Sequence, residues 1–154
     1  MRVSLGASDL SSSVFSYDDI DPSGVDNDLQ HFSIKPDSAD LIPVLKSALA
    51  INPNIKIMAS PWSAPAWMKT NKSAKGGSLK PEFFGVYARY FVKYIQAMKA
   101  QGIPIDAITI QNEPLNPDNN PSMYMTAFDQ ALFIKNHLGP EFAKNNITTK
   151  IILY

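Results

Sequence analysis

The chain alternates short strand-forming runs with helical stretches along its whole length. Four runs rich in apolar and β-branched residues are predicted strands: Arg2–Ala7, Ile55–Ser60, Ala107–Gln111 and Lys150–Tyr154. A strand followed by a helix and then another strand implies parallel pairing with a right-handed crossover. The order therefore predicts an α/β fold with one parallel sheet.

Two helices are predicted between the last three strands. Pro81 suits the first turn of the earlier helix, and Gly102 suits its end. The later helix is expected to begin at Thr126, an N-cap residue with Asp129 three positions on, which is a variant of the capping box. Gly139-Pro140 is expected to end it.

A third helix and two long loops complete the pattern. The helix is expected from about Ile42 to Ala50, with Pro43 in its first turn. Long loops after the first two strands are typical of active-site architecture on a (β/α) barrel. Such a barrel has eight strands and about 250 residues, so four strands make half of one. The sequence predicts a partial barrel wall.

Composition excludes several classes of protein. The chain has 154 residues, of which 45 % are apolar and 18 % charged, and this is globular composition. The formal net charge is zero, so neither nucleic acid nor an anionic membrane is indicated as the main partner. No run approaches the roughly 18 apolar residues of a membrane span. The chain has no cysteine, which excludes disulfides and thiolate metal sites.

The glutamate at the end of the third predicted strand is the main candidate for chemistry. Glu113 stands in Gln111-Asn112-Glu113-Pro114, directly after the apolar run that ends at Ile110. Catalytic side chains collect at the carboxyl ends of parallel strands. The other glutamates, Glu82 and Glu141, each follow a proline where a carboxylate favours the helix dipole. Glu113 is a candidate general acid; the alternative is a carboxylate that caps the next segment.

The loops after the first two strands carry further candidates. A tryptophan at a strand mouth can offer a flat face to a sugar ring and an N–H to a hydroxyl. We expect Trp62 to be the exposed ring because it is nearer the strand than Trp67; alternatively both rings are buried under the loop. Asp9 could bind a substrate hydroxyl or partner Glu113, and the alternative is an Asx-turn that closes the strand.

The remaining polar residues are predicted to have structural roles. An acidic loop matches no calcium-loop spacing and is expected to be solvated. Its members are Asp18, Asp19, Asp21, Asp26 and Asp28. His31 and His137 are too far apart for a paired metal-ligand spacing, and Lys69 is expected to solvate its loop. No Gly-rich nucleotide-binding motif follows a strand. The sequence therefore predicts no metal site and no cofactor.

Taken as a set, four stretches closely resemble glycoside hydrolase family 30. They are Ala59–Asn71, Gly76–Lys80, Tyr90–Tyr94 and Gln111–Pro114. The likeness is greatest to the branch that contains glucosylceramidases and β-1,6-glucanases, and it extends over the whole chain. Asn-Glu-Pro alone is shared by several related barrel families, whereas the set is highly specific.

The resemblance implies a retaining β-glycosidase on a (β/α)8 TIM barrel with an appended β-sandwich. In this family the glutamate matched by Glu113 is the acid/base, and the asparagine matched by Asn112 holds the sugar 2-hydroxyl. Asp9 and Trp62 match residues that bind hydroxyls on the far side of the sugar. Arg2 matches an arginine near the two catalytic carboxylates.

By the same resemblance, the chain corresponds to family strands 2 to 5. Residues 1–154 are therefore expected to form one fragment of the barrel domain, with the remaining strands and the β-sandwich absent. The family places its nucleophilic glutamate after the seventh strand, outside this chain. A retaining site needs two carboxyl groups about 5–5.5 Å apart. We expect the isolated chain to be inactive for that reason.

The resemblance predicts hydrolysis of β-glucosidic bonds in a β-glucoside, glucan or glucosylceramide. One alternative is a non-catalytic carbohydrate-binding remnant, in which Trp62, Asp9 and Asn112 hold sugar without cleaving it. Another is a β-1,6-glucanase or a xylanase of the same family. Location is open, and the family resemblance favours an extracellular, periplasmic or lysosomal protein.

Overall fold

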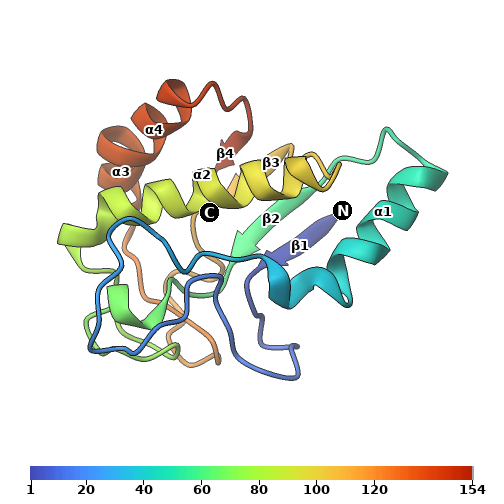
Figure 1. Ribbon diagram of the computed structural model, residues 1–154. Helices are drawn as coiled ribbons and strands as arrows, with labels where there is room; N and C mark the ends of the chain where they lie inside the picture. Colours follow the sequence, from blue (N-terminus) through green and yellow to red (C-terminus); the bar gives the residue numbers. More distant parts are fainter. Residues whose placement is uncertain (154) are drawn as a thin grey trace.

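The computed structural model describes residues 1–153, and its strands form one four-stranded sheet in the order β1-β2-β3-β4 (Figure 1). The strands are β1 (Arg2–Leu5), β2 (Met58–Pro61), β3 (Ala107–Thr109) and β4 (Lys150–Ile152). All three pairings are parallel. Successive strands are neighbours in space, as in the wall of a (β/α) barrel. The predicted parallel sheet is confirmed.

The observed strands are shorter than the predicted ones. At β1 the chain turns at Gly6, whose φ of +79° is a conformation that glycine adopts without strain. The last predicted strand ran to Tyr154, which lies outside the described residues. The register pairs Ala59 of β2 with both Val3 of β1 and Ile108 of β3, so the sheet is continuous at its centre.

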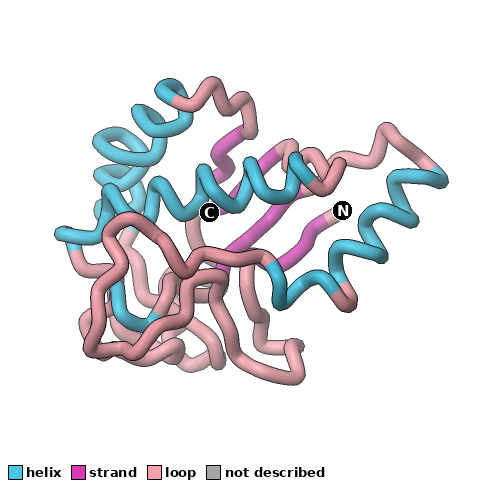
Figure 2. The backbone as a smooth tube through the Cα atoms, in the orientation of Figure 1, coloured by secondary structure: helices cyan, strands magenta, loops and turns pink. Residues whose placement is uncertain are grey.

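Helices follow the strands and cover one face of the sheet (Figures 1 and 2). They are α1 (Leu41–Ile51), α2 (Phe84–Ala100), α3 (Ala127–Phe133) and α4 (Gly139–Lys144). Short 3-10 turns cover Lys35–Ser38, Ala66–Met68 and Pro81–Phe83. The long loops (pink in Figure 2) gather at the end of the sheet toward which the strand arrows of Figure 1 point. This end of a parallel sheet is where sites form.

Gly139-Pro140 does not end the last helix, so that prediction was wrong. A π-helical segment, Ile134–Leu138, connects α3 directly to α4, with Pro140 in the first turn of α4. In the π segment the Gly139 N–H donates to the Ile134 carbonyl, five residues back. Proline removes one hydrogen bond of the regular helical ladder, and the wider π turns just before it allow the chain to continue. His137 consequently lies within the helical run.

The long loop after β1 is docked on α2 by aromatic side chains. The Tyr17 ring stacks on Tyr94 with centroids 5.6 Å apart, and the Tyr17 N–H donates to the Tyr90 hydroxyl at 3.1 Å. All three tyrosines are buried. This packing fixes the path of the loop, so the residues that follow β1 are held on a rigid support.

The acidic loop is only partly solvated, which corrects the sequence expectation. Asp18 is fully buried, and its backbone oxygen and its Oδ2 accept hydrogen bonds from the Trp67 indole N–H at 3.0 and 3.1 Å. Burial raises the pKa of Asp18 to about 6. Asp26 is also buried, and its Oδ2 accepts from the His31 N–H at 2.9 Å. Within residues 1–153 no group of three or more His, Cys, Asp or Glu side chains could hold a metal ion.

Candidate active site

An open cleft of about 510 Å³ lies at the carboxyl ends of β1, β2 and β3. The structure brings all five residues singled out from the sequence to this one cleft: Arg2, Asp9, Trp62, Asn112 and Glu113. The rest of its lining comes from Met58 at the start of β2, Thr109, Gln111, Ile152 at the end of β4, and Leu153. The residues that line the cleft thus carry two carboxylates, a guanidinium, two amides and an indole.

Arg2 organises the floor of the cleft. Its Nη2 donates to Asn112 Oδ1 at 2.5 Å, and its Nε donates to Ser60 Oγ at 3.1 Å. The guanidinium carbon lies 5.1 Å from the centroid of the Trp62 ring, a cation–π contact. Since the Asn112 oxygen accepts from Arg2, its Nδ2 is the atom of that amide left to donate to a ligand.

Trp62 is the partly exposed tryptophan and Trp67 the buried one, as expected from their distances to the strand. The Trp62 carbonyl accepts a hydrogen bond from Gln111 Nε2 at 2.6 Å, which ties the loop after β2 to the end of β3. Among the described residues no acceptor meets the shielded Trp62 Nε1. The indole N–H is thus a shielded donor without a partner among residues 1–153.

Glu113 lies just past the end of β3 in a rare backbone conformation. Its φ is +42°, a value that side-chain-bearing residues seldom adopt. Two backbone hydrogen bonds enforce it: the Asn112 N–H donates to the Pro61 carbonyl at 2.7 Å, and the Asn116 N–H donates to the Glu113 carbonyl at 2.9 Å. The Glu113 side chain is exposed. The alternative role, in which Glu113 caps the next segment, finds no matching hydrogen bond in residues 1–153.

Asp9 does not close an Asx-turn, so that alternative is wrong. Within the described chain, its turn is closed without the Asp9 carboxylate: the Leu10 N–H donates to Ser8 Oγ at 3.2 Å, the Ser8 N–H to Ser11 Oγ at 2.9 Å, and the Ser11 N–H to the Ser8 carbonyl at 3.1 Å. Asp9 is exposed and lines the cleft. Its carboxylate is therefore free to accept hydrogen bonds from a ligand.

Lys69 joins the loops that follow β2 and β3, a role missed from the sequence. It is fully buried, and its Nζ donates to Ser63 Oγ at 2.8 Å, to the Ala74 carbonyl at 3.0 Å and to the Ser122 carbonyl at 2.7 Å. Burial lowers the pKa of Lys69 to about 7. The expectation of a solvated lysine was wrong. A signal for its burial was its position directly after Trp67 and Met68, both of them buried.

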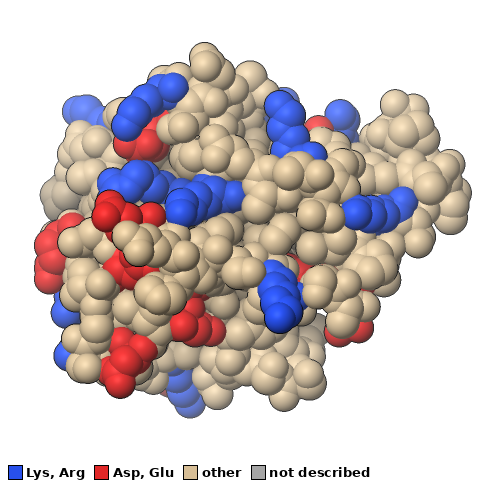
Figure 3. All heavy atoms as spheres, viewed as in Figure 1, with Lys and Arg blue, Asp and Glu red and all other residues tan. Residues whose placement is uncertain are grey.

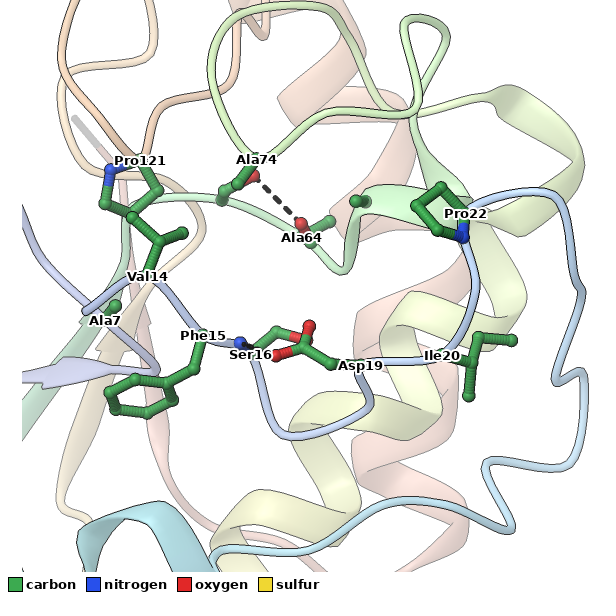
Figure 4. A pocket seen from close by; sticks show the side chains of 12 residues that line it. Ala7, Val14, Phe15, Ser16, Asp19, Ile20, Pro22, Ala64, Ala74 and Pro121 are labelled. Atoms are coloured by element: carbon green, nitrogen blue, oxygen red, sulfur yellow. Dashed lines mark hydrogen bonds between the residues drawn. The ribbon is translucent and has the colours of Figure 1, made fainter.

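A second cavity, of about 230 Å³, opens between the loops that follow β1 and β2 (Figure 4). Its walls are mainly apolar, with Val14, Ile20 and Ala64 among them. The Asp19 carboxylate at its edge already accepts from the N–H and hydroxyl of Ser16 at 2.8 and 2.6 Å. The polar groups able to contact a sugar are therefore concentrated in the larger cleft.

The surface and the helices give two further findings. Basic and acidic side chains are interspersed on the face in Figure 3, in keeping with the zero formal net charge. No helix among residues 1–153 combines the length and apolar character needed to cross a bilayer.

The fold and the cleft together define a segment of a (β/α)8 barrel with its polar cleft at the carboxyl ends of the strands. The chain belongs to glycosyl hydrolase family 30, because it matches the TIM-barrel domain of that family over residues 1–154. The resemblance noted in the sequence and the predicted partial barrel are both confirmed.

Several relatives match the chain along nearly all of its length. An endo-1,6-beta-D-glucanase of Aspergillus fumigatus is 38 % identical to this chain, and the alignment covers 100 % of this chain and 35 % of the length of that protein. The lysosomal acid glucosylceramidase of Mus musculus is 33 % identical, and its alignment covers 99 % of this chain and 31 % of the length of that protein. Among solved structures, an endo-beta1,6-glucanase superposes with a TM-score of 0.92 at 41 % identity. The superposition covers 99 % of this chain and 34 % of the length of that protein. This chain spans about a third of the length of such relatives.

Proposed function

We propose that this chain supplies the acid/base side of the active site of a retaining β-glycosidase, with Glu113 as the acid/base. The observation that carries the proposal is the shared cleft. Glu113 extends from the carboxyl end of β3 into the same cleft as Asp9, Trp62 and Asn112. Family membership supports a glycoside as the ligand of that cleft.

Each side chain of the cleft then has a role. Glu113 protonates the departing glycosidic oxygen, and its carboxylate later takes a proton from the water that releases the sugar. Asn112 Nδ2 donates to the sugar 2-hydroxyl, while Asp9 accepts from hydroxyls at the far side of the ring. Trp62 offers its ring face to the same sugar. Arg2 holds Asn112 and Trp62 in place.

A retaining mechanism also requires a nucleophilic carboxylate about 5–5.5 Å from the acid. Asp9 is the other carboxylate of this cleft, and we assign it to hydroxyl binding because it matches a hydroxyl-binding residue of the family that the sequence resembles. We propose that residues 1–154 act as one segment of a barrel domain, and that they do not complete turnover by themselves.

We propose a β-glucosidic bond as the one cleaved, with β-1,6-linked glucan as the favoured substrate. The identities to three proteins named as endo-1,6-beta-D-glucanases are 36–38 %, against 33–35 % for five proteins named as glucosylceramidases. A non-catalytic sugar-binding role is the alternative, and it would need the same Asp9, Trp62 and Asn112.

Hydrolysis assays test this proposal. The natural polypeptide that contains residues 1–154 is expected to release glucose units from β-1,6-glucan and nitrophenol from p-nitrophenyl β-glucoside. Glu113→Gln should lower kcat by about 10²–10⁴-fold, the usual contribution of a general acid–base group. Glu82→Gln, in the turn before α2, is the matched control and should leave kcat unchanged. Full activity of Glu113→Gln would refute the acid/base assignment, and turnover by residues 1–154 alone would refute their proposed dependence on the rest of a barrel.

A further inference from the structure

Two asparagine amides hold the carboxylate of Glu113 by one of its oxygens. Asn119 Nδ2 lies 2.5 Å from Glu113 Oε2, and Asn116 Nδ2 lies 3.4 Å from the same oxygen. A carboxylate oxygen has two lone pairs in the plane of the group, and two N–H donors occupy both. Within residues 1–153 no donor meets Oε1, which remains available to the cleft.

The orientation of the Asn116 amide follows from its backbone surroundings. Asn116 Oδ1 accepts a hydrogen bond from the Asp118 N–H at 3.2 Å. The Asn116 N–H donates to the Glu113 carbonyl at 2.9 Å, closing a tight turn that starts at the glutamate. With its oxygen turned toward Asp118, the amide presents its nitrogen to the carboxylate.

The loop that carries Asn119 is anchored just beyond it, at Ser122. The Ser122 N–H donates to the Ala74 carbonyl at 3.0 Å, and its hydroxyl donates to the Pro117 carbonyl at 2.7 Å. The Ser122 carbonyl accepts from the buried Lys69 ammonium at 2.7 Å. Because this support is shielded from water, it can hold the Asn119 side chain in the narrow range of positions that a catalytic contact requires.

We propose that Asn119, assisted by Asn116, is a positioning residue that keeps Oε2 of Glu113 as a hydrogen-bond acceptor and so directs the transferable proton to Oε1. The inference deepens the proposed function and rests on it. As the bond between the sugar C1 and the glycosidic oxygen breaks, the proton on Oε1 passes to that oxygen, and Glu113 becomes a carboxylate. The Asn119 N–H stabilises the charge left on Oε2. The nucleophilic carboxylate, supplied from outside residues 1–154, bonds to C1 in this step; water then displaces it from C1, and a proton of that water passes to Oε1.

The contact can be tested without turnover, because the chain has three glutamates, Glu82, Glu113 and Glu141. Labelling with [13Cδ]glutamate gives three carboxyl NMR signals, and Glu113→Gln assigns one of them by its disappearance. Asn119→Ala is expected to shift the Glu113 signal and to leave the signals of Glu82 and Glu141 in place. Asn120→Ala, at the exposed neighbouring position, is the control and should shift none. An unmoved Glu113 signal in Asn119→Ala overturns the inference.

The role in proton transfer is tested by comparing two leaving groups in the natural polypeptide. Phenyl β-glucoside needs a proton on its departing oxygen, whereas 2,4-dinitrophenyl β-glucoside departs without one. Asn119→Ala is expected to lower kcat/KM about tenfold for the phenyl substrate, a part of the 10²–10⁴-fold effect of an intact general acid, and to change the dinitrophenyl value less than twofold. Asn120→Ala should match the parent on both.

The outcomes separate this inference from the function beneath it. An equal loss on both substrates, or no loss on either, means that Asn119 does not aim the proton, and the inference is overturned. If Glu113→Ala lowers kcat/KM equally for the two substrates, the acid/base proposal itself is refuted. Discrimination by Glu113→Ala but not by Asn119→Ala rejects the positioning role alone.

Discussion

At the scale of single residues, Glu113 combines the position of the candidate acid with a strained backbone. A φ of +42° in a residue with a side chain costs of order 1–3 kcal/mol and persists only where the surroundings enforce it. Here the enforcing groups are the hydrogen bonds to Pro61 and from Asn116. They direct the carboxylate toward Asn119 and the cleft, so the residue with the strained backbone is also the proposed acid/base.

Glycine at position 113 should relieve this strain. Glycine adopts positive φ without a Cβ clash, so Glu113→Gly is expected to be more stable than Glu113→Ala by about 1 kcal/mol. Urea unfolding followed by tryptophan fluorescence measures the difference. At Glu82, which lies in a helical turn with ordinary dihedrals, the order should be reversed and alanine should be the more stable. An alanine variant as stable as the glycine variant at 113 would show that the backbone there is not strained.

Asp18 makes stability depend on pH in a direction unusual for an aspartate. Its folded-state pKa is about 6 against an ordinary value of 3.8, because burial penalises the charged form. Between these values the folded state binds the proton more tightly than the unfolded state does. The free energy of unfolding should therefore fall as pH rises from 4 to 6, by roughly 2–3 kcal/mol, and stay lower above pH 6.

Asp18→Asn should abolish that fall, since an amide does not titrate and its oxygen can still accept from the Trp67 indole. Denaturant unfolding of parent and variant at pH 4, 5, 6 and 7 gives the comparison. Asp28→Asn, at an exposed position of the same loop, serves as control and should follow the parent. Parallel curves for the parent and Asp18→Asn would remove Asp18 as the cause.

At the scale of elements, Lys69 links the loops after β2 and β3, and its loss should loosen both. Lys69→Met keeps the length of the side chain but leaves the Ala74 and Ser122 carbonyls without their buried donor. At about 1–3 kcal/mol for an unsatisfied buried group, the free energy of unfolding near pH 6 should drop by about 2–3 kcal/mol. Lys72→Met, on the exposed part of the same loop, should cost little.

The pH dependence of Lys69 has the opposite sign to that of Asp18. Its folded-state pKa is about 7 and its ordinary value is 10.5, so between these values the unfolded state binds the proton more tightly. The parent should gain stability as pH rises from 7 toward 10, and Lys69→Met should lack that gain. Thermal unfolding at pH 7, 8 and 9 measures both proteins, and an identical rise in the two would rule out Lys69 as the titrating group.

How far the sequence predicts these elements depends on the range of the forces involved. Periodicity and end signals are local, so the parallel sheet and α2 were predicted correctly. The capping box at Thr126 is also present, with the Asp129 N–H donating to the Thr126 hydroxyl. Gly139-Pro140 is a local stop signal that the π segment overrides. The grouping of Asp9, Trp62 and Glu113 followed from strand ends meeting at one edge of the sheet, whereas Arg2, the first residue of β1, was assigned by the family resemblance.

The contacts that sequence reasoning missed join residues far apart in the chain. Lys69 meets Ser122 across 53 positions, and Trp67 meets Asp18 across 49. Neither Ser122 nor Asp18 lies in one of the motifs found in the sequence, so each looked like an ordinary loop residue. Asn119 was passed over for a related reason, because its contact with Glu113 depends on how the loop after β3 folds back. Composition and spacing do not determine such a path.

At the scale of the whole molecule, the described sheet has two open edges. β1 pairs only with β2, and β4 pairs only with β3, so each outer strand presents unpaired backbone groups. Large apolar side chains lie near the β4 edge, where Ile152 is 41 % and Leu153 61 % exposed. Open edges of this kind pair with other chains unless something covers or charges them. In a closed barrel both edges would be paired.

Residues 1–154 alone should therefore self-associate through the sheet edges, and a charge at the β4 edge should oppose it. Ile152→Lys is expected to shift the chain toward monomer in sedimentation velocity runs from low to high micromolar concentration, because an edge lysine disfavours strand pairing. Ile51→Lys is the matched control: Ile51 is 86 % exposed at the end of α1, away from any sheet edge. If both lysines reduce association equally, general surface hydrophobicity is the cause. If the parent chain stays monomeric throughout, the open edges are not adhesive, and a barrel segment of this length is more self-sufficient than its exposed strands imply.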